Sequence, residues 1–176
     1  MFAPTYRGNT QKDAYYPLDK INLESVSKLC YDDYAFIFKM HPFIKQKVQI
    51  PNSMQKYIKD LSEYGDINEM FYITDILITD FSSNIYEFAL HKKPILFYAF
   101  DKDYYQLTRG VHRTLDDAPG TICQTFEEVL TTIKQQNFSY SKLEKFIEEA
   151  FDKHDKLSSD IAIDEILLNK RGELNE

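Results

Sequence analysis

Short apolar runs alternate with longer amphipathic stretches along the chain, a pattern that predicts repeated strand–helix units. The apolar runs predict strands at residues 1–5, 34–40, 75–79 and 94–100, the first of them only the end of a strand. The last two runs are apolar almost throughout, which is typical of a parallel sheet covered on both faces. We therefore predict a doubly wound, Rossmann-like α/β domain, in which ligands bind beyond the carboxyl ends of the strands.

Helical spacing of the apolar residues predicts helices at residues 21–30, 53–64, 68–73, 82–91, 126–136 and 141–157, and a charged helix near 160–170. Ser82 or Ser83 suits the N-cap position of the helix at 82–91. Residues 101–120 are rich in Asp, Arg and Tyr and are predicted to be irregular. The charges of both signs between 142 and 176 are most simply a solvated helix face.

The composition limits the class of partner. A net charge of −7 and a pI of about 5.1 exclude nucleic acid, because binding a phosphate backbone requires a basic surface. They are compatible with a nucleotide, since a diphosphate needs only a few local donors. The 176 residues fit one domain, and we expect most of the 13 Tyr and 13 Phe residues to fill its core.

Cysteine usage and the absence of targeting signals indicate a cytosolic protein. Cys30 and Cys123 show no metal-binding or redox spacing, so we expect reduced, buried thiols. Residues 1–7 lack the basic start and apolar middle of a signal peptide. The longest apolar run, 94–100, is far shorter than the roughly 20 residues of a membrane helix. Any work at a membrane is therefore expected from the cytosolic side, as a peripheral partner.

Polar residues follow each predicted strand. They are Thr5, Tyr6, Arg7 and Gly8 after the first, Lys39 and His41 after the second, Thr79, Asp80, Ser82 and Ser83 after the third, and Asp101 after the fourth. The alternation of side chains along a strand predicts that Lys39 and His41 point to the same side. Because the carboxyl ends of parallel strands meet at one edge of a sheet, these groups are predicted to converge on one site.

The turn at 79–83 leads directly into a predicted helix. A helix N-terminus offers unpaired N–H groups and a partial positive charge, so with the hydroxyls of Ser82 and Ser83 it is a candidate seat for phosphate. The alternative is that one serine only caps the helix and Asp80 only braces the turn. Glu87, one turn later, is placed either to accept hydrogen bonds from ribose hydroxyls or simply to face solvent.

His41 and Arg109 are the remaining candidates for chemistry. An imidazole binds phosphate when protonated and transfers protons near neutral pH, although a lone histidine is more often structural. Gly110 beside Arg109 lets the backbone turn while the guanidinium reaches a phosphate with two donors. The alternative is an ordinary surface arginine in a loop.

A series of motifs occurs in order along the chain: FAPTYR at 2–7, KMHP at 39–42, DINEMF at 66–71, TDILITDFSS at 74–83, EFAL at 87–90, KPILFY at 93–98, Tyr105, RG at 109–110 and PG at 119–120. Together they resemble the C-terminal lobe of the CDP-glycerol:poly(glycerophosphate) glycerophosphotransferases, the teichoic acid polymerases and primases with their ribitol-transferring relatives. The resemblance covers residues 2–136 and is most specific from 66 to 98. Residues 137–176 resemble the C-terminal helices of the family without a matching motif.

The resemblance implies a GT-B architecture, with two Rossmann-like lobes and the active site between them. Residues 1–176 would form the C-terminal lobe, which holds CDP-glycerol. The terminal hydroxyl of a poly(glycerol phosphate) or lipid-linked acceptor, at the cytosolic face of the membrane, attacks the phosphate that carries glycerol, and CMP leaves. No cofactor is implied and metal use stays open. A second family histidine, the base for the acceptor, belongs to an N-terminal lobe, so we expect this chain to be a piece of a longer protein and inactive alone.

The family's motif residues map to His41, Asp80, Ser82, Ser83, Glu87 and Arg109. To these we add Arg7, Lys39, Thr79 and Gly110 as substrate-binding candidates at the same strand ends. His41, with Lys39 behind it, is expected to neutralise charge on the transferred phosphoryl group or on CMP. The sequence departs from the family pattern at His112 and Thr114, which leaves the donor and acceptor preference open.

Other interpretations remain. One keeps the fold and changes the donor, as in a ribitol-phosphate transferase or a GT-B transferase of another nucleotide sugar. Another is a nucleotide-binding module without turnover. A phosphoacceptor receiver domain is disfavoured, because it requires paired acids after its first strand and residues 5–7 supply none.

Overall fold

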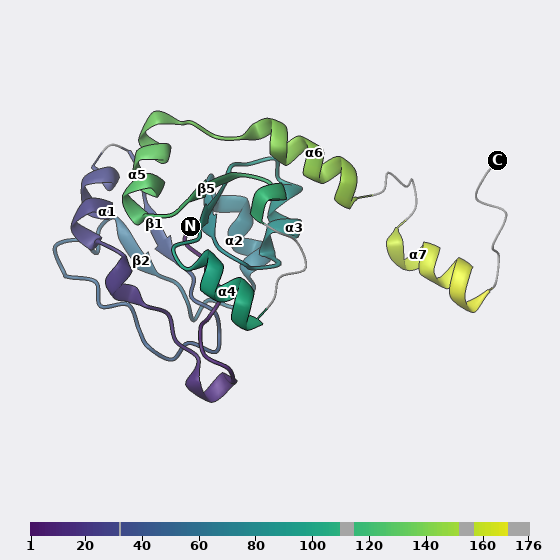
Figure 1. The fold of residues 1–176 in the computed structure, drawn as a ribbon, viewed down its shortest axis with the longest axis horizontal. Helices are drawn as coiled ribbons and strands as arrows, with labels where there is room; N and C mark the ends of the chain where they lie inside the picture. The colour runs from purple at the N-terminus through teal and green to yellow at the C-terminus, as the bar shows by residue number, and fades with distance from the viewer. Residues whose placement is uncertain (32, 110–114, 152–156, 169–176) are drawn as a thin grey trace.

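The structure, a computed structural model, describes residues 1–31, 33–109, 115–151 and 157–168 (Figure 1). Its strands are β1 (Phe36–Phe38), β2 (Ile58–Asp60), β3 (Leu77–Thr79), β4 (Ile95–Tyr98) and β5 (Thr121–Cys123). Its helices are α1 (Leu23–Cys30), α2 (Ile67–Ile73), α3 (Asn84–Ala89), α4 (Lys102–Arg109), α5 (Phe126–Gln135), α6 (Tyr140–Ala150) and α7 (Ser158–Ala162), which continues as a π-helical turn at Ile163–Leu167. Short 3₁₀ turns lie at Gln11–Asp13, Leu18–Lys20 and Leu115–Asp117.

The first residues of the chain form the centre of the sheet. The paired strands of the described residues run parallel, β1 with β2 and β4 with both β3 and β5. Phe2 bridges Phe38 of β1 and Ile78 of β3, and the backbone N–H of Ala3 donates to the Ile78 carbonyl at 2.8 Å. The order is therefore β2–β1–residues 1–3–β3–β4–β5. This is the Rossmann order, whose switch point lies between the first strand and β3.

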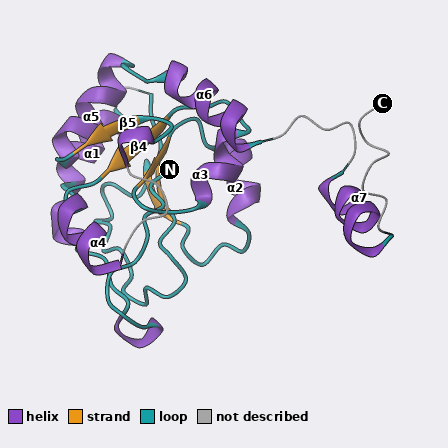
Figure 2. Ribbon diagram, turned by 45° about the vertical axis from the view of Figure 1, so that its right-hand side comes forward, coloured by secondary structure: helices purple, strands orange, loops and turns teal. Residues whose placement is uncertain are grey.

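Helices cover both faces of the sheet (Figures 1 and 2). On one face, α1 and α5 pack with side chains such as Phe2, Phe38 and Ile78. On the other, α2, α3 and α6 pack with the neighbouring strand residues, among them Leu77 and Phe97. Successive strand residues thus alternate between two cores, which explains why the strands read as continuous apolar runs. The predicted doubly wound α/β class is confirmed, and the predicted aromatic core is present in both layers.

The C-terminal helix stands apart from this body (Figure 1). Leu157, Ile166 and Leu167 in and beside it are more than 70% exposed. Within the described ranges, every helix falls short of the length and apolar character that crossing a membrane requires.

Several predicted elements were wrong. Residues 53–64 are turns followed by β2, because Ile58 is fully buried and pairs with Phe36 of β1. Residues 102–109 are the helix α4, whose polar sequence buries only Tyr105 and so gave little periodic signal. The strand β5 was not predicted. The helix predicted at 141–157 ends at Ala150, and residues 152–156 lie outside the described residues.

Candidate functional site

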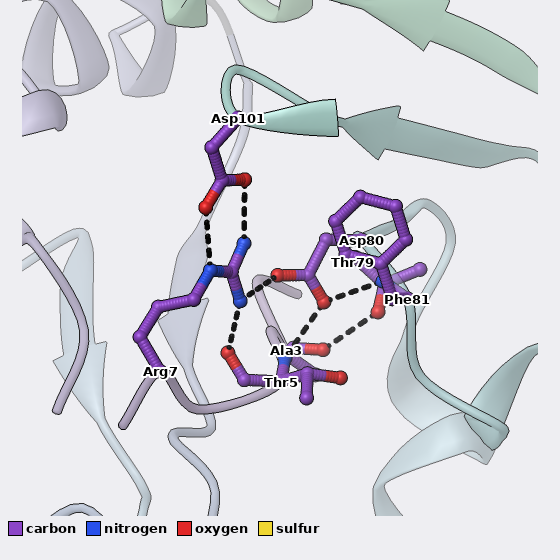
Figure 3. A network of polar contacts seen from close by, with 7 residues as sticks. All are labelled: Ala3, Thr5, Arg7, Thr79, Asp80, Phe81 and Asp101. Atoms are coloured by element: carbon purple, nitrogen blue, oxygen red, sulfur yellow. Dashed lines mark hydrogen bonds and ion pairs between the residues drawn. The ribbon is translucent and has the colours of Figure 1, made fainter. Parts of the chain in front are cut away.

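The Arg7 network, made of Thr5, Arg7, Asp80 and Asp101, closes the carboxyl ends of the first strand, β3 and β4 (Figure 3). The Arg7 guanidinium donates to Asp101 through Nε at 2.7 Å and Nη2 at 2.9 Å. Its Nη1 donates to Asp80 Oδ2 and to the Thr5 carbonyl, both at 2.9 Å. A guanidinium held by two carboxylates in this way is fixed in direction as well as position.

Asp80 is the deepest member of the Arg7 network, with a fully buried side chain. Its Oδ1 accepts the backbone N–H groups of Thr5 and Phe81, each at 2.7 Å. Burial raises the pKa of Asp80 above its ordinary value, opposed by the charge of Arg7 and by the N–H donors. Because all these partners are donors, the carboxylate is the form that the site accommodates. Burial alone would lower the pKa of Arg7, but its bond to Asp101 and the two negative charges raise it.

A sharp turn directs Arg7 back into the site. Arg7 and Tyr15 exchange backbone hydrogen bonds at 2.7 and 3.0 Å, and Gly8 between them has φ +98°. A Cβ at Gly8 would lie 2.2 Å from the Asp13 carbonyl oxygen, so only glycine fits. Thr10 and Asp13 form a capping box that fixes the following turn.

Thr79 and Lys39 are buried and engaged with the protein itself. The Thr79 hydroxyl donates to the Ala3 carbonyl at 2.8 Å, which ties β3 to the first strand (Figure 3). The Lys39 ammonium donates to the carbonyls of Ser62 and Tyr64, and burial lowers its pKa. Lys39 and His41, predicted to point to the same side, contact different neighbours: Lys39 these two carbonyls, and His41 the rings of Tyr6 and Phe43.

The Tyr6 cluster, made of Tyr6, His41 and Arg109, lies beside the Arg7 network. The Tyr6 ring centroid is 4.8 Å from that of His41 and 4.5 Å from Cζ of Arg109. His41 Nδ1 accepts the Phe43 backbone N–H at 3.2 Å, so the neutral ring carries its proton on Nε2. Burial lowers the pKa of His41, which favours that neutral form.

Arg109 is held by aromatic rings. Its Cζ lies over Tyr6 and, at 5.8 Å, over Tyr105. Among the described residues no carboxylate pairs with it, and its buried Nη2 has no hydrogen-bond partner. A buried donor without an acceptor costs roughly 1–3 kcal/mol, so a ligand that accepts this hydrogen bond would be favoured. Gly110, predicted as its partner, lies outside the described residues.

Tyr105 connects the Arg7 network with the Tyr6 cluster. Its ring stacks on Phe81 with centroids 4.0 Å apart and planes at 8°, and Cζ of Arg7 lies 4.8 Å from its centroid. Burial raises the pKa of Tyr105. Phe81 in turn leads directly to Ser82 and Ser83. The turn after β3 thus contacts Arg7 through Phe81, and Tyr105 connects it with Arg109.

The turn after β3 keeps its serine hydroxyls largely uncommitted. Ser83 is the N-cap of α3 but makes no capping hydrogen bond through its side chain, and Ser82 Oγ only accepts the Asn84 N–H at 3.3 Å. Glu87 is exposed on α3. Helix α3 has six residues, so its dipole is a weaker source of positive potential than the sequence suggested.

An open pocket of about 960 Å³ lies next to His41. It is lined by residues of the loop 40–50 and of the segment around β2, including Lys45, Lys59 and Ser62. Across the described residues, no group of three or more His, Cys, Asp or Glu side chains could hold a metal ion.

The sequence as a whole matches a known family. The model of the CDP-glycerol:poly(glycerophosphate) glycerophosphotransferases matches residues 1–168. The chain belongs to this family. The expectation drawn from its motifs is thereby confirmed.

The curated relatives of this chain are named for teichoic acid synthesis. A teichoic acid poly(ribitol-phosphate) polymerase of Bacillus spizizenii is 33% identical over 174 residues, 98% of this chain and 28% of the relative. A teichoic acid glycerol-phosphate primase of Bacillus subtilis is 37% identical over 147 residues, 83% of this chain and 37% of the relative. The chain spans about a third of the length of the curated relatives that it matches.

Solved structures agree with the family assignment. The wall teichoic acid polymerase TagF has a TM-score of 0.69 and 30% sequence identity to this chain, covering 84% of it and 38% of TagF. A TagF variant soaked with CDPG is similar at a TM-score of 0.68 and 30% identity, covering 84% of this chain and 37% of that one. The predicted fold, a Rossmann-like lobe of the GT-B type, is confirmed.

Sequence reasoning missed two aromatic residues of this candidate site. Tyr6 was noted only as part of a strand end, and Tyr105 only as a motif position. The spacing of Tyr105 and Arg109 by four residues would have placed both on one face of a helix, had α4 been predicted. Asp101 was noted at a strand end, but its pairing with Arg7 has no local signal in the sequence.

Proposed function

We propose that this chain supplies the CDP-glycerol-binding lobe of an enzyme that transfers glycerol phosphate from CDP-glycerol to a growing teichoic-acid-type polymer. The observation that carries the proposal is the unpaired, buried Nη2 of Arg109 at the switch point of the sheet, within 6 Å of the ring on which His41 also packs. Family membership supplies the ligand class, a nucleoside diphosphate polyol.

The diphosphate would lie between the turn after β3 and the Tyr6 cluster. Ser82 and Ser83 offer hydroxyls and backbone N–H groups, and Arg109 offers guanidinium donors from the opposite side. Glu87, exposed one turn into α3, would accept hydrogen bonds from the ribose. Arg7, Thr79 and Asp80, whose polar atoms are occupied within the protein, would position the turn rather than touch the substrate.

His41 would act on the transferred phosphoryl group. Its Nε2–H is the imidazole donor left after Nδ1 accepts the Phe43 N–H. As the acceptor hydroxyl attacks the phosphorus that carries glycerol, negative charge grows on the phosphoryl oxygens and on departing CMP. Donors from His41 and Arg109 that meet this charge lower the barrier, since such transfers depend mainly on positioning and electrostatics. Lys39 would support the backbone beside His41 through the Ser62 and Tyr64 carbonyls.

The other substrate and the second lobe complete the proposal. The acceptor would be poly(glycerol phosphate) or a lipid-linked primer, reached by peripheral association with the cytosolic face of the membrane. The base for the acceptor hydroxyl would come from an N-terminal GT-B lobe. The chain by itself is then expected to bind the donor weakly and not to polymerise it.

Calorimetric titration of the chain with CDP, CDP-glycerol and UDP tests this function. We expect CDP and CDP-glycerol to bind and UDP to bind at least 10-fold more weakly. Replacing Ser82 and Ser83 together with alanine should weaken CDP binding by about 10-fold or more, the loss of hydrogen bonds to a charged group. The matched control is Ser158→Ala with Ser159→Ala, two serines that begin α7. Tight UDP binding without CDP binding, or unchanged affinity in the first double variant, would reject the proposal.

A ribitol-phosphate donor is the second candidate, because the ribitol-phosphate polymerases match more of this chain than the glycerol-phosphate relatives do. The match covers 98% and 91% of the chain in two of them, compared with 83% for the primase. Competition between CDP-ribitol and CDP-glycerol for the chain distinguishes these donors. A clear preference for CDP-ribitol would move the assignment to ribitol phosphate while leaving the CDP site in place.

A further inference from the structure

The two residues proposed to bind phosphate, His41 and Arg109, both contact the ring of Tyr6. His41 packs on its ring from the end of β1, and Arg109 from the end of α4, although 68 residues separate these two in the sequence. Because 4.8 Å and 4.5 Å separate them from the same centroid, the imidazole centre and Cζ of Arg109 lie within about 9.3 Å of each other. The ring therefore keeps both groups close enough to reach one ligand.

The backbone on both sides of Tyr6 is tied to the sheet. Before it, the Thr5 N–H donates to Asp80 and the Thr5 carbonyl accepts from Arg7. After it, Arg7 and Tyr15 exchange backbone hydrogen bonds. The Tyr6 ring thus projects from a segment anchored to β3 and β4 through the Arg7 network, while its hydroxyl has no hydrogen-bond partner among the described residues.

Contact with a ring holds an arginine without using up its donors. A carboxylate partner occupies the guanidinium N–H groups, as Asp80 and Asp101 do for Arg7. A ring face attracts the cation and leaves the N–H groups at its edge free. Arg109 over Tyr6 is oriented in this way, with Nη2 still unpaired.

The same ring shields one side of His41. Phe43 packs on His41 with centroids 4.7 Å apart and also occupies Nδ1 through its N–H, so the ring is held from two directions. The charged groups around it are directed elsewhere. Lys39 donates to the Ser62 and Tyr64 carbonyls, Asp60 accepts from Val48 and Ser62, and Arg109 lies across Tyr6.

We propose that Tyr6 is a positioning residue, whose ring sets the distance and orientation of His41 and Arg109 so that both reach the same phosphate-bearing ligand. The ligand part of this inference rests on the proposed function. The ring itself forms and breaks no bond. What matters is its aromatic face, so phenylalanine should replace tyrosine without loss, and an aliphatic side chain should not.

The first experiment needs no ligand. The side-chain NMR signals of His41 and of Arg109 Nε are followed during a pH titration in the chain and in Tyr6→Phe, Tyr6→Leu and Tyr57→Leu variants. Tyr57 is a half-buried tyrosine at the amino end of β2 and serves as the matched control. In Tyr6→Leu we expect the pKa of His41 to rise toward its ordinary value, because water reaches the ring, and the Arg109 signal to average toward that of a free side chain. The other two variants should match the unmodified chain.

The second experiment titrates CDP into the same variants. We expect Tyr6→Leu to bind at least 10-fold more weakly, with Tyr6→Phe and Tyr57→Leu within 2-fold of the chain. Arg109→Met should weaken CDP binding less in the Tyr6→Leu variant than in the unmodified chain, because Arg109 is already misplaced in Tyr6→Leu. If Tyr6→Leu fails to fold, Tyr6→Met, a flexible side chain that fills irregular gaps, takes its place.

The outcomes separate the two proposals. Shifted His41 and Arg109 signals with no CDP binding by any variant would support the positioning role of Tyr6 and reject the nucleotide site. Signals and CDP affinity in Tyr6→Leu that match the unmodified chain would overturn the positioning role. Equal losses in Tyr6→Phe and Tyr6→Leu would also overturn it, because the hydroxyl and not the ring would then be responsible.

Discussion

Arg7 and Arg109 both lie against the Tyr105 ring, with Cζ at 4.8 Å and 5.8 Å from its centroid, yet their guanidinium groups meet different partners. Arg7 is 7% exposed and bonded to two carboxylates. Arg109 rests on tyrosines and keeps a buried donor without an acceptor. The first arginine holds three strand ends together, and the second is the one that we propose binds a ligand.

This difference shows how a structural arginine can be distinguished from a ligand-binding one by the partners of its donors. An arginine with all its donors paired inside the protein contributes to stability, and only indirectly to binding. One held by rings keeps its direction and its charge for an anion. The four predictions below test that separation, beginning with the largest effect.

Replacing Arg7 with methionine should lower the free energy of unfolding by about 3–5 kcal/mol, because Asp80 would remain as a buried charge without its counter-ion. Arg109→Met should cost about 1 kcal/mol or less, since it removes mainly cation–π contacts. Urea denaturation of both variants measures the difference. Similar losses for the two arginines would break the comparison.

Asp80→Asn should lower the free energy of unfolding by about 2–4 kcal/mol. The variant keeps the shape of the side chain, but its amide NH₂ then faces a buried donor and leaves it without an acceptor. Asp101→Asn is the control. Its side chain is 16% exposed, and water can replace the lost bond, so we expect about half that cost or less. The same urea titrations compare them. A larger loss at Asp101 would show that it, rather than Asp80, anchors Arg7.

Arg109→Met should weaken CDP binding by about 10- to 100-fold, the value of hydrogen bonds to a charged group. Arg109→Lys should recover part of that loss, because the charge remains but the forked donor geometry does not. Calorimetry gives both affinities. CDP binding that survives Arg109→Met would place the phosphates away from the Tyr6 cluster.

The ionisation of His41 should make a small pH-dependent contribution to the free energy of unfolding. Burial lowers its pKa in the folded chain, while the unfolded chain protonates near the ordinary value of about 6.5. Just below that pH the unfolded state binds more protons, so stability falls as the pH falls. His41→Gln should therefore lose less stability than the unmodified chain between pH 7.5 and 5.5 in urea titrations. An equal loss would mean that water reaches His41 as freely in the folded chain as in the unfolded one.

The layered fold could be predicted from the sequence because buried parallel strands are apolar on both faces. The runs at 75–79 and 94–100 contain β3 and β4, and every residue of these two strands is buried. The strand β2 could not be predicted, since only Ile58 of its three residues is buried and its partner β1 lies 20 residues away. Helix α4 was missed because a helix with one buried residue has almost no apolar period.

The site could be predicted only as a set of strand ends. That rule correctly placed Arg7, Asp80 and Asp101 within one network, because parallel strands end at the same edge. It could not say that these charges would neutralise one another, since pairing depends on distances across 73 and 94 residues. It also overlooked aromatic side chains, which have no polar signature although they orient Arg109 and His41.

The central position of residues 1–3 has a consequence for how the sheet assembles during folding. Phe2 and Ala3 find their partners on β3 some 75 residues later, so β1 and β2, which can pair earlier, are joined to the rest of the sheet only once β3 is present. Contacts of such sequence separation are slow to form and leave apolar strands exposed in the meantime. The joining of the two halves of the sheet through residues 1–3 is therefore expected to be a late step of folding.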